Sequence, residues 1–272
     1  MLSVITSKDN PLVKQAVRLR ENADERRERG LFFLEGYRLC RDALASGFRP
    51  AAIFITKGAR AKYDTLALER SAGQAFEVAD YVAAKLRDTA NPQGVFGLFA
   101  IPPPGEDFWK PGGRYIALER VQDPGNLGAV ARTAEALGLD GLLVGGGSDA
   151  LSNREAFGCD VYHPKSLRAS MGSLLRLPVH IRDELAPALA EAAGRGYGVY
   201  AAVPDADALP ITQIDLRGGA VVAIGNEGAG LSEAAVAACG KRVTIPMAGR
   251  AESLNAAAAA VIVMWEMGRG GA

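Results

Sequence analysis

The chain has 272 residues and a formal net charge of zero, with 49% hydrophobic and 23% charged residues. This composition is typical of a soluble globular protein, and the length is sufficient for two modest domains that each bury a core. No apolar run reaches the roughly 18 residues of a membrane-spanning helix, and the first residues lack a signal-peptide pattern. These features exclude a membrane-spanning helix, and we expect a cytoplasmic protein.

Charge distribution and cysteine usage add two expectations. The first hundred residues carry a net charge of +4 and the remainder −4. A basic part joined to an acidic part suggests that nucleic acid is held mainly by the first, although solvated surfaces often vary this much. The three cysteines, Cys40, Cys159 and Cys239, are widely spaced and odd in number. We therefore expect reduced, buried thiols.

Helical and strand-like patterns alternate along the first hundred residues. The predicted helices span 9–29, 36–46, 60–72 and 80–88, and the predicted strands span 31–34, 52–56, 75–78 and 95–100. This alternation is typical of a small α/β sandwich. A proline- and glycine-rich stretch then predicts a linker over 105–113, between a first domain at 1–104 and a second at 114–272.

The densest basic stretch lies near the start of the chain and contains Arg18, Arg20, Arg26, Arg27 and Arg29. Acidic residues are interleaved with these arginines. Two interpretations stay open: the arginines contact nucleic acid, or the stretch is a solvated helix with ion pairs between positions i and i+4.

Strands and helices also alternate after the linker. The predicted strands span 114–119, 141–145, 197–203, 220–225 and 241–245, and the predicted helices span 127–137, 183–194, 231–238 and 253–267. This pattern predicts a parallel, doubly wound sheet with helices on both faces.

The segment Asp123-Pro124-Gly125-Asn126 joins the strand at 114–119 to the following helix. Apolar residues recur along that helix at helical spacing and leave Arg132 on its polar side. Ligands of open α/β sheets bind at the carboxyl ends of the strands. Asn126 and Arg132 are therefore candidate site residues, with a turn asparagine and a surface arginine as the structural alternatives.

Two later strands lead into similar polar segments. The strand at 220–225 breaks into a glycine-rich turn with Gly225 and Glu227, and the strand at 241–245 leads toward Ser253 and Asn255. Glycine-rich turns let the main chain approach a ligand closely. Ser253 is also a credible helix N-cap and Glu227 a helix-start acid, so structural roles stay open for both.

Several common motifs are absent from the sequence. It has no complete Gly-x-Gly-x-x-Gly dinucleotide turn, no phosphate-binding loop and no Gly-x-Ser-x-Gly elbow. The two histidines, His163 and His180, lie outside the three polar segments. Their positions argue against a Ser-His-Asp site and against a His-rich metal site, so we expect no metal.

The three segments, in this order and spacing over roughly 114–267, resemble the three motifs of the SpoU/TrmH-type RNA 2′-O-ribose methyltransferases of the SPOUT superfamily. The resemblance implies methyl transfer from S-adenosylmethionine to a ribose 2′-hydroxyl of structured RNA. It also implies a homodimer and a parallel α/β sheet whose C-terminal segment forms a trefoil knot. The stretch containing Asn10, Pro11, Glu35 and Gly36 looks like the opening of the smaller α/β domain, similar to ribosomal protein L30e, that binds substrate in many members.

The resemblance also assigns roles to individual residues. Those implied to line the S-adenosylmethionine pocket are Gly225, Ile245, Met247 and Leu254. Arg132 resembles the family's essential arginine, for which a general-base role has been proposed. Because a guanidinium stays protonated and has no acceptor lone pair, our hypothesis is that Arg132 binds the phosphate beside the target ribose and stabilises the developing alkoxide.

Further candidates follow from the same motifs. Asn126 is implied to orient Arg132 or the ribose hydroxyls, and Glu227 to pair with Arg132, while Ser253 and Asn255 complete the catalytic candidates. The segment at 164–172 resembles a family segment that faces substrate. The candidates for RNA contact are Arg20, Arg26, Arg27, Arg168 and Ser170.

Large-subunit ribosomal RNA is the favoured substrate, because simpler transfer-RNA members tend to lack the N-terminal extension. Transfer RNA is the second candidate. A rival of another class is a non-catalytic RNA-binding or assembly factor, although the intact polar set argues against it. A dinucleotide-dependent dehydrogenase is disfavoured because the glycine fingerprint is missing.

Overall fold

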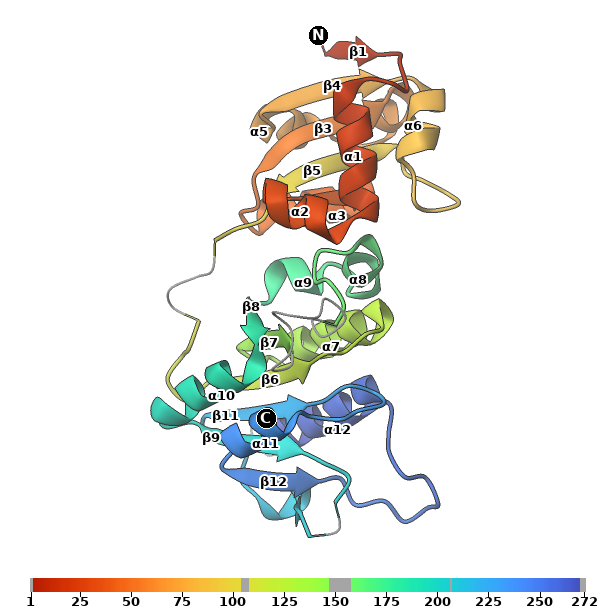
Figure 1. Ribbon diagram of the computed structural model, residues 1–272. Helices are drawn as coiled ribbons and strands as arrows, with labels where there is room; N and C mark the ends of the chain where they lie inside the picture. Colours follow the sequence, from red (N-terminus) through yellow and green to blue (C-terminus); the bar gives the residue numbers. More distant parts are fainter. Residues whose placement is uncertain (1, 104–107, 147–157, 206, 270–272) are drawn as a thin grey trace. The chain divides into compact units, whose positions relative to one another are not determined.

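The computed structural model describes residues 2–103, 108–146, 158–205 and 207–269. The chain divides into two compact units (Figure 1). The first unit contains 1–103 together with 161–176, and the second contains 104–160 together with 177–272. The segment at 161–176 thus belongs by its contacts to the first unit, although the sequence-based division counted it with the second domain.

Among the described residues, no helix combines the length and the apolar character needed to cross a membrane.

The first unit is built on a five-stranded mixed sheet. Its strands, in spatial order, are β1 (Ser3–Ile5), β4 (Gln74–Val78), β3 (Pro50–Thr56), β5 (Val95–Ala100) and β2 (Leu31–Glu35). The first three pair in parallel, and β5 pairs antiparallel with both β3 and β2. All but β1 were predicted. Only one of the three residues of β1 is buried, so it carries little of the alternation that identifies a strand.

Helices cover this sheet. They are α1 (Pro11–Glu21), α2 (Ala23–Arg29), α3 (Tyr37–Ala45), α4 (Lys57–Lys62), α5 (Leu66–Ser71), α6 (Asp80–Leu86), α8 (Pro164–Ala169) and α9 (Ser173–Arg176). The helix predicted over 9–29 is two helices, because Asn22 is extended and its side chain accepts the N–H groups of Asp24 and Glu25 as the N-cap of α2. The helix predicted over 60–72 is likewise divided into α4 and α5.

The core of the first unit lies between α1, α6 and one face of the sheet, where Val13, Leu19 and Leu86 pack with Phe33 and Phe54. The segment that precedes α8 packs against the opposite face of the sheet, where the ring of Tyr162 lies 4.8 Å from that of Phe32. In addition, α8 contacts β2 and α9 contacts α3. A segment distant in sequence therefore completes this unit.

The second unit is built on a seven-stranded sheet. Its spatial order is β10 (Leu209–Pro210), β12 (Lys241–Thr244), β9 (Gly198–Ala202), β11 (Ala220–Ile224), β6 (Arg114–Glu119), β7 (Gly141–Gly146) and β8 (Val179–Glu184). Every pairing is parallel, as predicted. The chain runs outward from β6 through β7 to β8 and then returns to build the other side. The order therefore reverses between β6 and β11, which is where open α/β sheets bind ligands.

Helices cover both faces of this sheet, as the doubly wound pattern predicts. One face holds α7 (Pro124–Ala136) and α12 (Ala256–Gly268), and the other holds α10 (Leu185–Gly194) and α11 (Glu233–Ala238). The boundary predicted for the helix at 183–194 is two residues early, because β8 runs to Glu184. Gly138, with φ of +66°, follows the end of α7, where glycine adopts a left-handed conformation without strain.

Part of the predicted linker is packed structure. Residues 104–107 lie outside the described residues, but Phe108 is only 7% exposed. Its ring lies 5.0 Å from that of Tyr115 and 4.6 Å from that of His180. The second half of the predicted linker, beginning at Phe108, therefore packs into the core of the second unit.

The buried guanidinium of Arg26 provides a test of the first unit. Arg26 is 2% exposed, and its Nη1 donates to the carbonyl oxygens of Leu19 at 2.6 Å and Arg20 at 3.1 Å near the end of α1. We expect Arg26→Ala to lower the free energy of unfolding by about 2–4 kcal/mol, because it leaves buried carbonyls without partners. The matched control is Arg27→Ala, at an exposed neighbour. Urea denaturation followed by circular dichroism measures both, and equal losses would contradict the structural role of Arg26.

Candidate functional site

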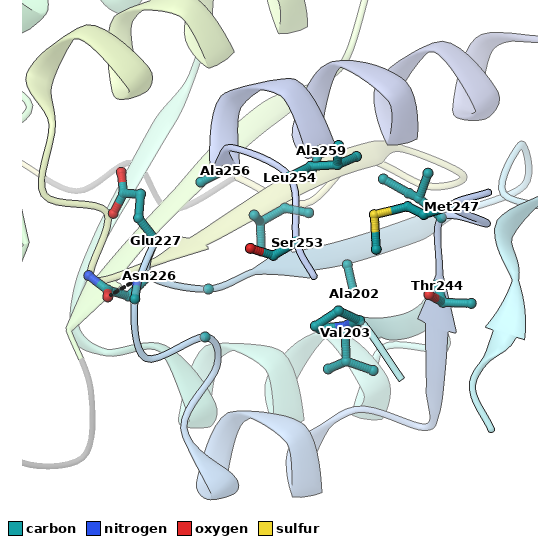
Figure 2. A pocket seen from close by; sticks show the side chains of 16 residues that line it. Ala202, Val203, Asn226, Glu227, Thr244, Met247, Ser253, Leu254, Ala256 and Ala259 are labelled. Atoms are coloured by element: carbon teal, nitrogen blue, oxygen red, sulfur yellow. Dashed lines mark hydrogen bonds between the residues drawn. The ribbon is translucent and has the colours of Figure 1, made fainter. Parts of the chain in front are cut away.

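A cleft lies in the second unit at the carboxyl ends of β9, β11 and β12, beside the start of α12 (Figure 2). The residues that line it are 202–204, 224–228, 230, 244–245, 247, 253–254, 256 and 259. Asn226 and Glu227 lie at one end of the cleft and Met247 at the other, with Ser253 between them (Figure 2). Two of the three polar segments found in the sequence thus form its walls.

The turn after β11 has a conformation that requires glycine at its first position. A Cβ atom on Gly225 would lie 2.1 Å from the carbonyl carbon of Gly230 and 2.2 Å from the amide nitrogen of Leu231. Such distances are far below van der Waals contact. Only glycine lets the two sides of the turn approach this closely, which shapes the edge of the cleft.

Asn226 holds the same turn, a role that sequence analysis missed. Its Nδ2 donates to the carbonyl oxygen of Arg120 at 2.8 Å, and its Oδ1 accepts the N–H groups of Gly228 and Ala229 at 2.8 and 2.9 Å. An asparagine that accepts from the main chain two residues onward is typical turn chemistry, so the Asn-Glu-Gly sequence carried this signal. The turn is thereby fixed to the end of β6.

Glu119, the last residue of β6, makes a second connection. It is 1% exposed, and its carboxylate accepts the main-chain N–H of Ser232 at 2.6 Å and the Ser232 hydroxyl at 2.7 Å. Ser232 in turn caps α11. Sequence analysis missed this pair also, although a carboxylate that ends an apolar strand is a recognisable signal, since buried charges require partners.

The four predicted cofactor residues, Gly225, Ile245, Met247 and Leu254, all line the cleft. Met247 and Leu254 remain 37% and 36% exposed, so the cleft offers apolar surface. Within the described chain, the main chain of 246–254 makes no hydrogen bond. Its N–H and carbonyl groups are available to a ligand, which is the combination of apolar lining and few polar groups typical of small-molecule sites.

Three predicted polar residues from the three segments form one network. Asn126 Nδ2 donates to Glu227 Oε1 at 2.7 Å, and Asn255 Nδ2 lies 3.3 Å from Asn126 Oδ1. The main-chain N–H of Gln122 lies 3.4 Å from Glu227 Oε2. The structure therefore brings Asn126, Glu227 and Asn255 together at the carboxyl edge of the sheet.

The start of the last helix differs from the sequence prediction. Asn255, not Ser253, is the N-cap of α12, and its Oδ1 accepts the N–H groups of Ala257 and Ala258. Ser253 lies in the loop and lines the cleft. Its hydroxyl is therefore not committed to capping, whereas Asn255 combines capping with the polar network.

Arg132 lies in the middle of α7, because the helix begins at Pro124 rather than at 127. It is exposed and makes no hydrogen bond or ion pair with the described residues. Within this chain the Glu227 carboxylate is bonded to Asn126 and not to Arg132. The guanidinium is thus available for a ligand from solution.

The structure corrects the expected surface position of three candidates for RNA contact. Arg26 is buried, as described above, and Ser170 is fully buried, with its hydroxyl donating to the Leu167 carbonyl oxygen at 2.9 Å. Arg20 donates from Nη1 to three consecutive carbonyl oxygens at the end of α6, those of Lys85, Leu86 and Arg87. These side chains hold the first unit together, because each is consumed by internal hydrogen bonds.

The two other candidates, Arg27 and Arg168, differ from these in exposure. Arg27 is exposed. Arg168 is part-exposed and its Nη1 lies 2.5 Å from Oδ2 of Asp88. Both side chains are therefore accessible enough to contact RNA.

No cluster of three or more His, Cys, Asp or Glu side chains that could hold a metal ion occurs among the residues that the structure describes. The three cysteines are free thiols. Burial raises the pKa of the Cys159 thiol to about 12, and the nearby carboxylate of Asp160 adds to the increase. Burial likewise raises the pKa of Cys239 to about 12, with a further contribution from Glu119. These thiols are therefore protonated at neutral pH.

Two family models match this chain, the SpoU rRNA Methylase family over 113–265 and the MRM3-like substrate binding domain over 10–97. The 23S rRNA (guanosine(2553)-2′-O)-methyltransferase RlmP of Bacillus subtilis is 30% identical over 263 residues, which cover 97% of this chain and 98% of that protein.

Solved structures resemble the chain over almost its whole length. The AdoMet-bound rRNA methyltransferase from Sinorhizobium meliloti has a TM-score of 0.84 and 30% identity, with 98% of both chains covered. The SpoU methyltransferase AviRb from Streptomyces viridochromogenes, in complex with the cofactor AdoMet (S-adenosylmethionine), has a TM-score of 0.81 and 28% identity. It covers 96% of this chain and 97% of its own.

The raised pKa values of Cys159 and Cys239 predict slow alkylation. Since an ordinary thiol ionises near pH 8.5 and the thiolate is the nucleophile, we expect iodoacetamide to modify both at least about 100-fold more slowly in the native than in the unfolded protein. The free energy of unfolding should also fall as the pH rises above about 9, because the unfolded thiols ionise first. Mass spectrometry of alkylated peptides measures the rates, and native rates equal to those of a free thiol would refute the prediction.

Proposed function

Because the chain belongs to the SpoU rRNA methylase family, we propose that it transfers the methyl group of S-adenosylmethionine to a ribose 2′-hydroxyl of 23S ribosomal RNA. The family match confirms the resemblance seen in the three sequence motifs. The predicted RNA methyltransferase activity and the predicted cofactor agree with these relatives. The observation that carries the proposal is that two of the three segments line one cleft, while the first joins them through the hydrogen bonds of Asn126 to Glu227 and Asn255.

The cleft suits S-adenosylmethionine. We assign its binding to Gly225, Ile245, Met247 and Leu254, supported by their position around one cleft and by the available main chain of 246–254. Apolar side chains can pack against the adenine ring, while main-chain groups hydrogen-bond to its edge and to the methionine end. When bound, S-adenosylmethionine supplies an electrophilic methyl group, so the protein needs chiefly to align donor and acceptor.

We assign Arg132 the role of a phosphate clamp. Its exposed guanidinium, without an internal partner among the described residues, can bind the phosphate beside the target ribose with two parallel hydrogen bonds. There it also stabilises negative charge that develops on the 2′-oxygen. As the O–CH₃ bond forms and the S–CH₃ bond breaks, the 2′-hydroxyl proton passes to a phosphate oxygen or to water, because a guanidinium has no lone pair to accept it.

The amide and carboxylate network has a positioning role in this proposal. Glu227, held by Asn126, offers a fixed acceptor for a ribose hydroxyl, and Asn255 fixes the orientation of Asn126. The Ser253 hydroxyl, which lines the cleft, is a further hydrogen-bonding group for substrate or cofactor. Groups held in place before the reaction lower the cost of alignment.

Other parts of the proposal concern the whole molecule. We propose a homodimer, supported by the exposed apolar side chains of α12, Val261, Ile262 and Trp265, of which Trp265 is 62% exposed. We also propose a C-terminal trefoil knot, an L30e-like first domain and a cytoplasmic location, supported by the family match and by the rRNA methyltransferases among the relatives. Ribosomal RNA is preferred to transfer RNA because RlmP matches the chain over its full length.

The proposal predicts methylation of 23S rRNA that depends on Arg132. Purified protein with radiolabelled S-adenosylmethionine should methylate unmodified 23S rRNA at one ribose, located by mass spectrometry. Arg132→Lys should reduce kcat by about 100-fold or more, because lysine cannot form the bidentate phosphate contact. Affinity for S-adenosylmethionine, measured by calorimetry, should not change.

The control for this experiment is Arg195→Lys, at an exposed arginine on the same unit. High activity of Arg132→Lys with a normal pH profile would refute the clamp. A wild-type protein that binds no S-adenosylmethionine would instead favour the non-catalytic RNA-binding factor, and methylation of transfer RNA alone would favour the second substrate.

The cofactor assignment predicts a severe effect of Gly225→Ala. The added Cβ would overlap the main chain of Gly230 and Leu231 and displace the turn that borders the cleft. We expect at least about a 10-fold loss of S-adenosylmethionine affinity by calorimetry, equivalent to about 1.4 kcal/mol. Gly240→Ala is the matched control, since its Cβ would meet only the Val199 carbonyl oxygen at an ordinary 3.6 Å. If Gly225→Ala bound S-adenosylmethionine with unchanged affinity, the turn at Gly225 would not be part of the cofactor site.

A further inference from the structure

We propose that a groove on the first unit binds one unpaired nucleotide of the RNA substrate, through a stacked tyrosine, two side-chain amides and flanking cations. The groove consists of two cavities that share Asn91 and Gln93 as lining residues, one on each side of the loop at 87–94. This loop joins α6 to β5 and projects from the unit (Figure 1). The inference rests on the proposed function, because it takes RNA as the substrate. It assigns a binding site to residues far in sequence from the three motifs.

A buried carboxylate fixes the loop from below. Glu35 is 7% exposed, and its Oε2 accepts the main-chain N–H groups of Asp88 at 2.6 Å and Thr89 at 3.2 Å. The Thr89 hydroxyl donates to the other carboxylate oxygen. On the outer side, Arg168 pairs with the Asp88 side chain. These bonds hold the start of the loop in place before any ligand arrives, as a binding site requires.

Two amide side chains lie on this fixed loop. Asn91 and Gln93 border the cavities on both sides of it. Both residues are exposed, and neither amide makes a hydrogen bond with the residues that the structure describes. Each amide offers two donors and one acceptor. These groups match the Watson–Crick and Hoogsteen edges by which proteins read unpaired bases.

An aromatic platform stands beside the amides. Tyr63 lines one cavity, and its ring is stacked on that of Tyr37 at 4.7 Å with an interplanar angle of 14°. Lys62 Nζ lies 5.4 Å from the Tyr63 ring, and the Arg41 guanidinium lies 5.8 Å from the Tyr37 ring. The contacts with Tyr37 and Lys62 therefore hold the ring of Tyr63 in place. Stacking on such rings is how proteins hold single-stranded bases without requiring one sequence.

Cations border the groove where a phosphate would lie. Lys62 and Arg87 line the same cavity as Tyr63 and form no ion pair with the described residues. Arg38 lines the other cavity and lies 4.0 Å from the Asp42 carboxylate. The acidic residues on the groove are Asp80 and Glu35, and the Glu35 carboxylate is bonded to the loop. Arg87 and Lys62, without a carboxylate partner among the described residues and beside an aromatic ring and free amides, favour a nucleotide over a neutral ligand.

The test uses the full-length protein with 23S rRNA and saturating S-adenosylmethionine. Tyr63→Ala should raise the KM for RNA by about 10-fold with kcat unchanged, because one stacking contact is lost. Tyr63→Phe keeps the ring and should behave as wild type. Gln93→Ala should also raise the KM, and ultraviolet cross-linking should map bound RNA to the peptides that contain Tyr63 or Gln93.

The charge contribution has its own matched pair. Arg87→Ala should raise the KM for RNA and reduce the slope of log affinity against log salt by about 0.7, as expected for one phosphate contact on a single strand. Arg70→Ala removes an exposed arginine of the same unit that does not line the groove and should change neither quantity. Circular dichroism and S-adenosylmethionine affinity report whether each variant is folded.

The outcomes separate the groove from the proposed function. If wild-type protein methylates 23S rRNA but Tyr63→Ala, Gln93→Ala and Arg87→Ala keep the KM within about twofold of wild type, the groove is wrong and the function stands. If no RNA is methylated while single-stranded RNA still cross-links at Tyr63 and Tyr63→Ala abolishes the cross-link, the proposed function is wrong and the groove stands. Cross-links confined to other peptides overturn the groove.

Discussion

The site depends on a connection between the carboxyl ends of two adjacent parallel strands, β6 and β11. Asn226 reaches from the turn after β11 to the carbonyl of Arg120, and the buried carboxylate of Glu119 reaches from β6 to Ser232. A parallel pair has no hairpin to join its ends, so side chains must do so. Because Gly225 lets the turn fold back against Gly230, the side chains of Asn226 and Glu119 can reach their partners. The cleft and the polar network both depend on this conformation of the turn.

The features that could be predicted from the sequence are those that depend on residues close together in the chain. Five of the seven parallel strands, the helices on both faces and the three polar segments follow from apolar periodicity and turn residues, which depend on near neighbours, whereas β8 and β10 were not predicted. The same holds for the cleft wall, because segments that end parallel strands meet at one edge. Capping residues account for the errors in helix boundaries. Asn22 caps a second helix within the single helix predicted over 9–29, and Asn255 caps the last helix, which therefore begins later than predicted.

What sequence analysis missed depends on packing between distant residues. Arginines in a basic run look alike in sequence, yet Arg26 is buried against the end of α1 while Arg27 is exposed. The two arginines point to different sides of α2, one toward α1 and one toward solvent. The carbonyl groups of α1 that accept hydrogen bonds from Arg26 cannot be identified from the local sequence. Ser170 was misjudged for the same reason, since the segment around it docks on strands more than a hundred residues earlier.

Because the segment at 161–176 belongs to the first unit, a single cut in the chain cannot separate the two units intact. The chain crosses from one unit to the other after residues 103, 160 and 176, so the first unit borrows α8 and α9 from the middle of the second. Cutting the gene at the proline-rich stretch would remove Tyr162 from Phe32 and α8 from β2. Recombination between relatives exchanges an intact first unit only when both pieces are carried together. A single crossover in the proline-rich stretch would pair β2 of one parent with α8 and α9 of the other.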